Sequence, residues 1–391
     1  MGVCILIALY AALAGAATIP GSANQALPPI RIGISNAQSG PSGSLGRQLV
    51  LGSKAYFDLV NGSGGIRGQK IELIVRDDGY EPDPAVQNTF HLINDERVFF
   101  LFDYVGTSPL TRVLPLLKYY EGRQVVNVAP LTGADTQRKP PYDRFVFNIR
   151  ASYADETKVL VDYLYSTGHR KIGFMGQADS YGKSGEVGVA RQLASYGLKI
   201  WEPVAYRRNE SAKMREQADI LRRSGADAVI AVGVYGPVAE FVREARLSGW
   251  NVPVANVSFV GADALLERLR EYGAEAHRDF TQNLINSEVA PSPEQTEYAL
   301  VRNFRANVPK EDYGSVALEG WLNAVVAGEA IRRSPVGATR AQFIEAMESL
   351  GGWDPGVGLP LGFSHSDHQG LRKVWLTRTE GGHWVPVENG R

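Results

Sequence analysis

The sequence contains one cysteine among 391 residues, and this residue, Cys4, lies within the first 26 positions. If that segment is removed, the mature chain has no thiol, which excludes a cysteine nucleophile, structural disulfides and zinc sites built on cysteine. Neither sign of charge is in excess, since 41 Lys and Arg residues face 42 Asp and Glu residues. Because there is no basic field and no Lys/Arg run, nucleic acid and anionic membranes are not expected as partners.

Long apolar runs are also scarce. The run Val3–Ala17 is uncharged and is followed by small residues, although the usual Lys or Arg at the start of a signal is missing. A secretory signal needs roughly 7–15 apolar residues, whereas a membrane-spanning helix needs about 20. We therefore predict that residues 1–26 are a signal peptide and that the mature protein is soluble and periplasmic. A buried N-terminal helix is the alternative.

Motifs that would indicate catalysis are missing or misplaced. A phosphate-binding loop requires four residues between its first glycine and Gly-Lys-Ser, but five lie inside Gly176–Gly182. The Gly-x-Ser-x-Gly pattern of a nucleophile elbow does not occur. The segment His365–His368 is predicted to be a solvated loop rather than a metal site, and Asp77-Asp78 to cap a turn rather than to act as an acid/base pair. The sequence therefore predicts a protein that is not an enzyme and that has no cofactor.

Short apolar runs, which predict strands, alternate from residue 30 onward with amphipathic stretches, which predict helices. The strands are predicted at 30–35, 71–76, 98–105, 125–129, 171–176 and 228–233. The helices are predicted at 45–60, 84–94, 109–120, 153–166, 182–196, 212–223, 236–247, 293–306, 315–332 and 340–349, and a hairpin at 373–376 and 384–387. This alternation indicates an α/β fold with parallel sheets covered on both faces, and its restart near 145–152 indicates two doubly wound lobes.

Ligands of open parallel sheets bind beyond the carboxyl ends of the strands. In this chain the segments that follow predicted strands are rich in Gly, Ser, Thr, Asn and Tyr. These residues supply hydroxyls, backbone donors and aromatic faces, and few of them can act as a general base. The composition of these segments therefore favours binding over catalysis.

Several short motifs occur in a characteristic order. They are Ser39-Gly40-Pro41, Leu45-Gly46, Val60-Asn61, Gly64–Gly68, Asp77-Asp78, Pro130–Ala134, Gly176–Gly182 and Val232–Tyr235. Over roughly residues 29–375 the chain resembles the branched-chain amino-acid-binding proteins, the Leu/Ile/Val-type periplasmic receptors of ABC importers. The resemblance implies a type I periplasmic-binding (Venus-flytrap) fold, a small-molecule ligand, a membrane permease as partner, and a monomer. A sensory receptor on the same fold is the second interpretation, and an enzyme is the third.

The resemblance also implies that three strands cross between the lobes, near residues 148–152, 286–290 and 362–366. The first crossing agrees with the break in the strand–helix alternation. The N-terminal lobe is then 27–149 plus 288–363, and the C-terminal lobe is 150–287 plus 364–391.

Binding positions can be carried over from the family by their place after each strand. The resemblance implies that a ligand carboxylate is held by Gly106, Thr107, Ser108, Leu131, Thr132 and Gly133. It implies that the walls are formed by Leu45, Tyr181 and Tyr235, with Tyr153 near the hinge. Tyr104, at the end of the strand predicted at 98–105, and Phe259 are further candidates, which makes the candidate pocket aromatic and neutral.

The chain departs from the family at the position that holds the ammonium group of an amino acid. The family has an acidic residue there, whereas this chain has Ser258. A buried ammonium without a carboxylate partner costs several kcal/mol. Unless Asp103 or Asp263 replaces the missing acid, or the alignment is slipped by a few residues, an α-amino acid is a poor ligand. We therefore expect an aromatic or aliphatic carboxylate, an amide or a more hydrophobic compound.

Overall fold

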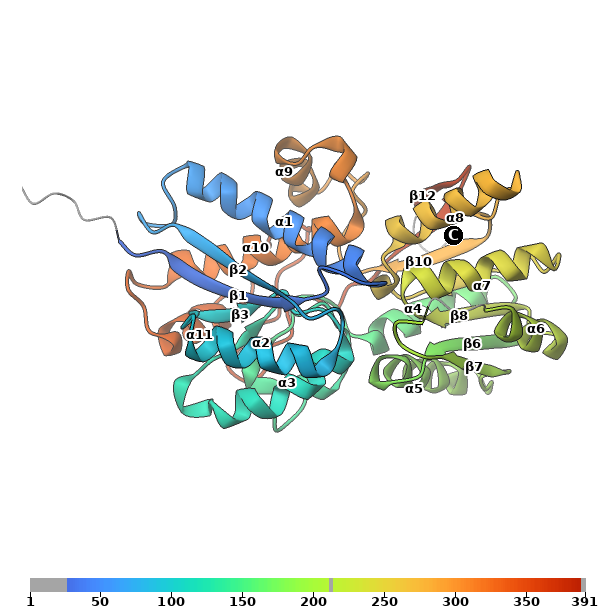
Figure 1. Ribbon diagram of the computed structural model, residues 1–391, viewed down its shortest axis with the longest axis horizontal. Coiled ribbons are helices and arrows are strands. Elements are labelled where there is room, and N and C mark those ends of the chain that lie inside the picture. The colour runs from blue at the N-terminus through green and yellow to red at the C-terminus, as the bar shows by residue number, and fades with distance from the viewer. Residues whose placement is uncertain (1–26, 211–213, 388–391) are drawn as a thin grey trace, which may run out of the picture.

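A computed structural model describes residues 27–210 and 214–387, which form two α/β lobes, each with a largely parallel sheet (Figure 1). The predicted fold class is confirmed. The predicted signal peptide, residues 1–26, lies outside the described residues. No helix in the described part of the chain is long and apolar enough to span a membrane.

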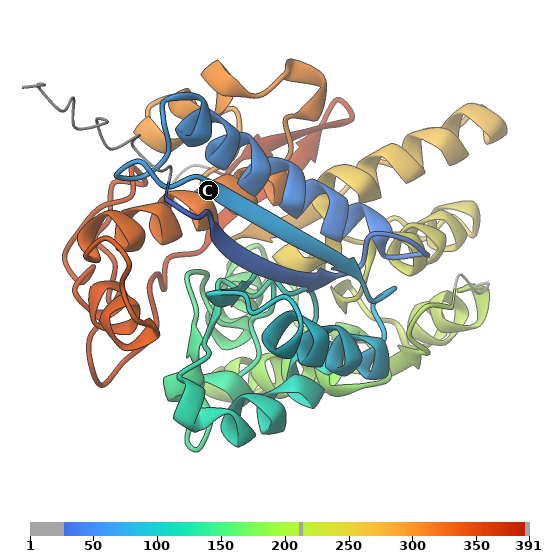
Figure 2. The ribbon, with the colours of Figure 1, turned by 60° about the vertical axis from the view of Figure 1, so that its left-hand side comes forward.

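The first lobe is built on a five-stranded parallel sheet with the order β2-β1-β3-β4-β5. Its strands are β1 (Ile30–Asn36), β2 (Ile71–Asp77), β3 (Phe100–Phe102), β4 (Asn127–Val128) and β5 (Val146–Phe147). Its helices are α1 (Gly43–Gly62), α2 (Pro82–Asn94), α3 (Thr107–Tyr119), α9 (Ala299–Asn307), α10 (Ser315–Arg333) and α11 (Arg340–Glu348). In Figure 2 the long strands β1 and β2 run side by side, with α1 above them.

Alternation of side chains along β3 explains why both faces of this sheet are covered. Phe100 and Phe102 pack into the apolar cluster shared with α1 and α10, whereas Leu101 packs into the cluster shared with α2 and α3. Successive residues of a strand point to opposite faces, so each face needs its own layer of helices. Most of α10 is buried, including Trp321, because it lies between the sheet and the helices α1, α9 and α11.

The second lobe is built on a seven-stranded sheet with the order β12-β11-β10-β9-β8-β6-β7. Its parallel strands are β6 (Ile172–Gln177), β7 (Pro203–Tyr206), β8 (Ala228–Val232), β9 (Val254–Asn256) and β10 (Leu284–Glu288). The antiparallel hairpin of β11 (Trp375–Glu380) and β12 (His383–Pro386) extends it. Its helices are α4 (Tyr153–Ser166), α5 (Ser180–Ser195), α6 (Arg215–Ser224), α7 (Tyr235–Leu247) and α8 (Ala262–Ala276).

Several predicted elements differ from the observed ones in their bounds. The strand predicted at 98–105 is shorter, because Asp103 has a positive φ of 49° that ends the extended run. The helix predicted at 293–306 begins only at Ala299, after a turn in which Gln295 N–H donates to Ser292 O. The strand β7 and the helix α8 were not predicted, and β9 and β10 were expected only as a strand before Ser258 and as the crossing strand near 286–290, without bounds of their own. The predicted start of the helix at 212 lies outside the described residues.

The chain passes between the lobes after β5, after β10 and before β11. One residue from each passage, Ala151, Val289 and Val374, packs into a single small apolar cluster. The loop before β11 lies against the first lobe, because Gly370 N–H donates to Asn148 O at 2.7 Å. We therefore propose that the third passage lies near residues 372–374 and that the boundary between the lobes falls there rather than at 363.

Candidate functional site

Loops from the two lobes meet along one surface, which we call the lobe interface. On the first lobe it includes Tyr80 and Ser108, and on the second Gln177, Asp179 and Tyr235. The Ser108 hydroxyl donates to Asp179 Oδ2 at 2.8 Å, and Gln177 Nε2 donates to the Tyr80 hydroxyl at 3.2 Å. Tyr80, Ser108 and Gln177 are buried, whereas Asp179 and Tyr235 are partly exposed. The lobes are therefore closed on each other in this structure.

Two threonine hydroxyls of the first lobe lie side by side at the lobe interface. Thr107 is the first residue of α3, and Thr132 follows β4. Their Oγ1 atoms are 2.7 Å apart, and both side chains are buried. Because the first N–H groups of a helix have no partner within the helix, Thr107 can offer a backbone donor as well as its hydroxyl. Converging neutral donors of this kind suit a carboxylate.

Two glycines among the predicted site residues, Gly106 and Gly133, allow loops to approach aromatic rings closely. Gly106 has a φ of 101°, and a Cβ there would lie 2.2 Å from Cε2 of Tyr80. A Cβ at Gly133 would lie 2.5 Å from Cδ1 of Tyr153. The absence of a side chain at these positions therefore sets the distance between the donor loops and the rings.

The aromatic side chains form a buried group that joins both lobes. The ring centroids of Tyr153 and Tyr181 are 5.3 Å apart, those of Tyr181 and Phe259 are 4.7 Å apart, and those of Tyr80 and Phe259 are 5.9 Å apart. Tyr181 donates its hydroxyl to Gly233 O at 3.2 Å. The Tyr153 hydroxyl has no hydrogen-bond partner among the described residues. Tyr80 was not singled out from the sequence, although it follows a predicted strand.

The remaining wall residues also meet across the interface. Leu45 and Leu131 belong to the same apolar cluster as Tyr181 and Phe259 of the second lobe. A Cβ at Gly261, where φ is 75°, would lie 2.7 Å from Cδ2 of Leu45. Leu45 therefore closes against the second lobe.

Three of the predicted site residues make contacts within the first lobe or between the two lobes. Tyr104 packs between α2 and α3 in the first lobe, and its hydroxyl is 2.9 Å from that of Thr89, so the structure does not bring this ring to the others. Ser108 and Tyr235 make contacts between the lobes, since the Tyr235 hydroxyl accepts from Ser44 N–H at 3.4 Å.

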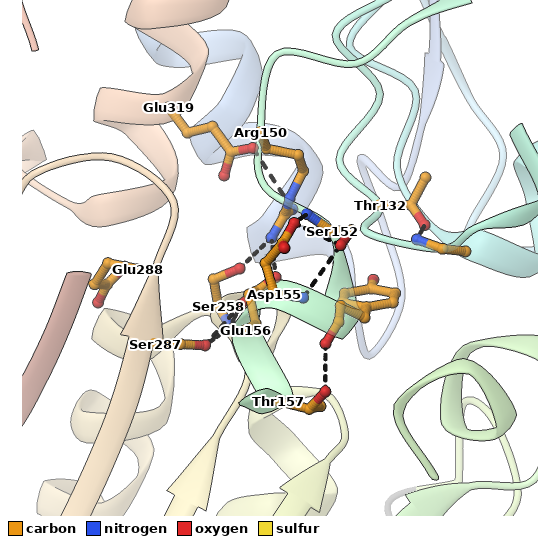
Figure 3. Close-up of polar contacts among 12 residues, drawn as sticks. Thr132, Arg150, Ser152, Asp155, Glu156, Thr157, Ser258, Ser287, Glu288 and Glu319 are labelled. Carbon is orange, nitrogen blue, oxygen red and sulfur yellow. Dashed lines mark hydrogen bonds and ion pairs between the residues drawn. The ribbon is translucent and has the colours of Figure 1, made fainter. Parts of the chain in front are cut away.

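A buried ion-pair cluster occupies the position around Ser258, and sequence reasoning missed it. Arg150 lies in the first passage between the lobes and is 2% exposed. Its Nη2 donates to Glu156 Oε1 at 3.3 Å and to the Ser258 hydroxyl, and its Nη1 lies 3.5 Å from Glu319 Oε1 (Figure 3). Glu156 Oε2 accepts from Ser258 N–H at 2.7 Å and from Ser287 Oγ at 2.6 Å. No local motif marks these residues, because their sequence positions are far apart.

Electrostatics in this cluster follow from burial and from the ion pairs. Burial by itself would lower the pKa of the Arg150 guanidinium, but Glu319 and Glu156 raise it above its ordinary value. Burial raises the pKa of Glu319 to about 7, although Arg150 opposes this shift. The position predicted from the sequence to face a ligand ammonium therefore lies beside an arginine that is paired with two buried carboxylates.

The two acids considered as substitutes for the missing one both make hydrogen bonds to residues of α10. Asp103 lies in the first lobe, where its Oδ1 accepts from Asn323 Nδ2 at 2.8 Å. Asp263 Oδ2 accepts from Ser315 N–H at 2.8 Å, at the start of α10. Both carboxylates are therefore used by α10 and its surroundings.

The motifs examined for catalysis have structural explanations. Asp77 and Asp78 accept from the backbone N–H groups of Gly79 and Tyr80 at 2.9 Å each, as in a capped turn. A Cβ at Gly182 would lie 1.9 Å from Gln177 O, so the glycine serves a close approach of backbone. Within residues 27–210 and 214–387, no group of three His, Cys, Asp or Glu side chains is placed to hold a metal ion.

We predict that Arg208 stabilises the closed arrangement. Its guanidinium joins the lobes, because Nη2 donates to Glu81 Oε2 at 2.9 Å and Nη1 to Asp179 Oδ2 at 3.3 Å. Arg208→Ala should shift the ligand-free protein toward open forms and increase its radius of gyration in small-angle X-ray scattering. Because partly exposed pairs contribute up to about 1 kcal/mol, the closed population should fall roughly fivefold. Arg207→Ala is the control, since Arg207 is 85% exposed, and equal scattering for both variants would contradict the prediction.

We predict that Glu288, at the end of β10, makes stability depend on pH. Burial raises the pKa of Glu288 to about 8, while Asn286 Nδ2 donates to its Oε1 at 2.9 Å. The folded protein therefore holds a proton that the unfolded chain releases above about pH 4.5, so stability is full below that pH and falls as the pH rises toward 8. One pKa unit corresponds to about 1.4 kcal/mol.

Glu288→Gln should remove this loss, because glutamine stays neutral and keeps an acceptor oxygen. Thermal unfolding of the variant at pH 8.5 should occur several degrees above that of the unmodified chain, with little difference at pH 5. The exposed Glu297 provides the control variant, Glu297→Gln, which should change neither value. A Glu288→Gln protein that is less stable at pH 8.5 would refute the assignment.

Comparisons with known proteins agree with this architecture. Residues 29–383 match the model of a family described as periplasmic binding protein. An "amino acid binding protein" of Pseudomonas aeruginosa is 24% identical over 235 residues, 59% of this chain and 61% of that protein, so the aligned part spans less than two thirds of it. The "Leu/Ile/Val-binding protein homolog 7" of Brucella abortus (strain 2308) is 25% identical over 84% of this chain and 82% of its own length. A crystal structure of a possible leucine/isoleucine/valine-binding protein from Rhodopirellula baltica is 31% identical, with a TM-score of 0.84 over 93% of this chain and 96% of that one.

Proposed function

Since the chain belongs to the periplasmic binding protein family, we propose that it captures a small organic ligand in the periplasm and delivers it to the membrane permease of an ABC transporter. The ligand is an aromatic or aliphatic carboxylate, an amide or another largely apolar compound. The paired hydroxyls of Thr107 and Thr132 of the first lobe, which lie 2.7 Å apart, together with the buried rings of Tyr153 and Tyr181 of the second lobe, carry this proposal. Residues 1–26 act in it as the export signal.

Binding proceeds by hinge closure. Ligand contacts made by both lobes are available only when the lobes are together, so the ligand shifts the population toward the closed form. The first lobe supplies hydroxyl and amide donors, and the second supplies the rings of Tyr153, Tyr181 and Phe259. Burial of the ligand's apolar surface against these rings provides affinity, while the donors fix its orientation.

Branched-chain amino acids are disfavoured by the charge around Ser258. Arg150 lies beside this residue with its side chain 1% exposed. An α-ammonium placed there would be desolvated beside a guanidinium, and the nearby carboxylates of Glu156 and Glu319 are already paired with Arg150. The family's common ligand class is therefore not the one that this site suits best.

The proposed function is tested by removing both hydroxyls. A thermal-shift panel of leucine, short amides, aromatic acids and lipophilic alcohols first selects the compound with the largest stabilisation. In the Thr107→Ala, Thr132→Ala double variant, calorimetric affinity for that compound should fall at least 100-fold if it is a carboxylate, because two charge-assisted hydrogen bonds are lost. Thr111→Ala is the control on the same helix, since the Thr111 hydroxyl makes no hydrogen bond among the described residues. Undiminished binding by the double variant would refute the assignment.

A further inference from the structure

We infer that Arg150 determines the ligand class of this site, which is a carboxylic acid that carries a second, uncharged hydrogen-bond acceptor next to its carboxylate. The 2-oxo acids have this chemistry. The inference rests on the proposed function, because it assumes that the carboxylate is held at Thr107 and Thr132. It adds the chemical nature of the ligand group that lies next to the carboxylate.

The buried donors at the site lack acceptors. Arg150 Nε and Nη1 are buried without hydrogen-bond partners among the described residues. Arg150 Nη1 is within ion-pair distance of Glu319 Oε1 but makes no hydrogen bond to it. A guanidinium has five N–H donors and no acceptor, so only a group that accepts can complete its shell. The missing group is therefore an acceptor rather than an ammonium, which only donates.

The acceptor has to lie close to the carboxylate. Arg138 donates from Nη1 to Thr132 O at 3.3 Å and from Nη2 to Arg150 O at 3.2 Å, so a single guanidinium bridges the two backbones. Tyr153 N–H donates to Gly133 O at 2.7 Å and holds the start of α4 against the same loop. Thr132 and Arg150 therefore belong to adjoining segments, and for this reason we place the acceptor on the carbon next to the carboxylate.

The charge around Arg150 favours an uncharged acceptor over a second carboxylate. Glu156 and Glu319 already face the guanidinium, at 3.3 Å and 3.5 Å. A further anion would meet these two carboxylates, whereas a carbonyl oxygen adds no charge. The guanidinium contacts Glu319 of the first lobe and both Glu156 and Ser258 of the second, so an acceptor bound there also engages the closed arrangement.

Three acids that share one carbon skeleton test the inference on the unmodified protein. They are 4-methyl-2-oxopentanoate, 4-methylpentanoate and leucine, with phenylpyruvate, 3-phenylpropanoate and phenylalanine as a second, aromatic set. In isothermal titration calorimetry, the better-fitting set should show the oxo acid binding at least tenfold more tightly than the plain acid and at least 100-fold more tightly than the amino acid. An amino acid that binds as tightly as its oxo acid would overturn the inference. Equal binding of oxo and plain acids would overturn it and leave the proposed function standing, whereas binding of none of the six would count against the proposed carboxylate site itself.

Arg150→Lys separates recognition from a purely structural role. Lysine keeps the positive charge opposite Glu156 and Glu319, which favours folding, but it loses the planar fork of donors. The tenfold preference for the oxo acid over the plain acid should fall to near onefold in this variant. If both acids weaken equally and the tenfold ratio remains, Arg150 serves only the hinge and the inference is wrong.

Discussion

Gly52→Ala is expected to destabilise the first lobe by about 3 kcal/mol, because the new methyl group has no room. A Cβ at Gly52 would lie 1.8 Å from Ala317 O of the facing helix α10. The same two helices also approach closely at Gly320 of α10, where a Cβ would lie 2.1 Å from Leu49 O of α1. These neighbours are backbone atoms, so the two helices have to separate, which strains the cluster around Trp321.

The control for this variant lies on the same helix. Gly62 is the last residue of α1, and a Cβ there would meet nothing within 4 Å. Alanine is a better helix former than glycine by up to about 1 kcal/mol, so Gly62→Ala should be neutral or slightly stabilising. Urea unfolding followed by circular dichroism measures both free energies. Equal effects of the two variants would show that propensity, not the approach of the helices, determines the result.

Arg150→Met is expected to cost about 3–5 kcal/mol, because it leaves buried carboxylates without a cation. Glu156 is 0% exposed and Glu319 is 5% exposed. The Arg150→Met, Glu156→Gln double variant should recover part of the lost free energy of unfolding, because it removes a negative charge that has no cation beside it. The loss should also shrink from pH 8 to pH 5, since burial already raises the pKa of Glu319 to about 7 and removal of Arg150 raises it further.

An exposed ion pair nearby provides the comparison. Arg144 pairs with Glu121, and their side chains are 57% and 46% exposed. Because exposed pairs contribute little, Arg144→Met should change the free energy of unfolding by less than about 1 kcal/mol. A similar loss in Arg144→Met and Arg150→Met, measured by chemical unfolding at pH 7.5, would contradict the account of the buried cluster.

Long elements could be predicted closely, and short ones could not. The helix predicted at 153–166 is α4 with the same bounds, and its start is set by a capping box between Ser152 and Asp155. The strand predicted at 171–176 is β6, shifted by one residue. By contrast, β9 has only three residues and β7 four, which is too few for a periodic pattern to stand out.

Side-chain direction decided which site candidates come together. Tyr104 follows β3 as Thr107 does, yet its ring points into the core between α2 and α3. The general rule that ligands bind beyond strand ends locates a segment, but it does not say which of its side chains face the ligand. Thr107 and Thr132 share the interface because β3 and β4 are neighbours in the sheet.

The sequence by itself determined that this chain folds into two α/β lobes and that the loops after its strands carry hydroxyls and rings, and its resemblance to a family predicted that Ser258 stands where an acid would hold an ammonium. These properties depend on local periodicity and on residue type at each position. Only the tertiary structure decided what surrounds Ser258, because Arg150, Glu156 and Glu319 come from a lobe passage, α4 and α10. Ion pairs between such distant segments arise from packing, which sequence periodicity does not encode.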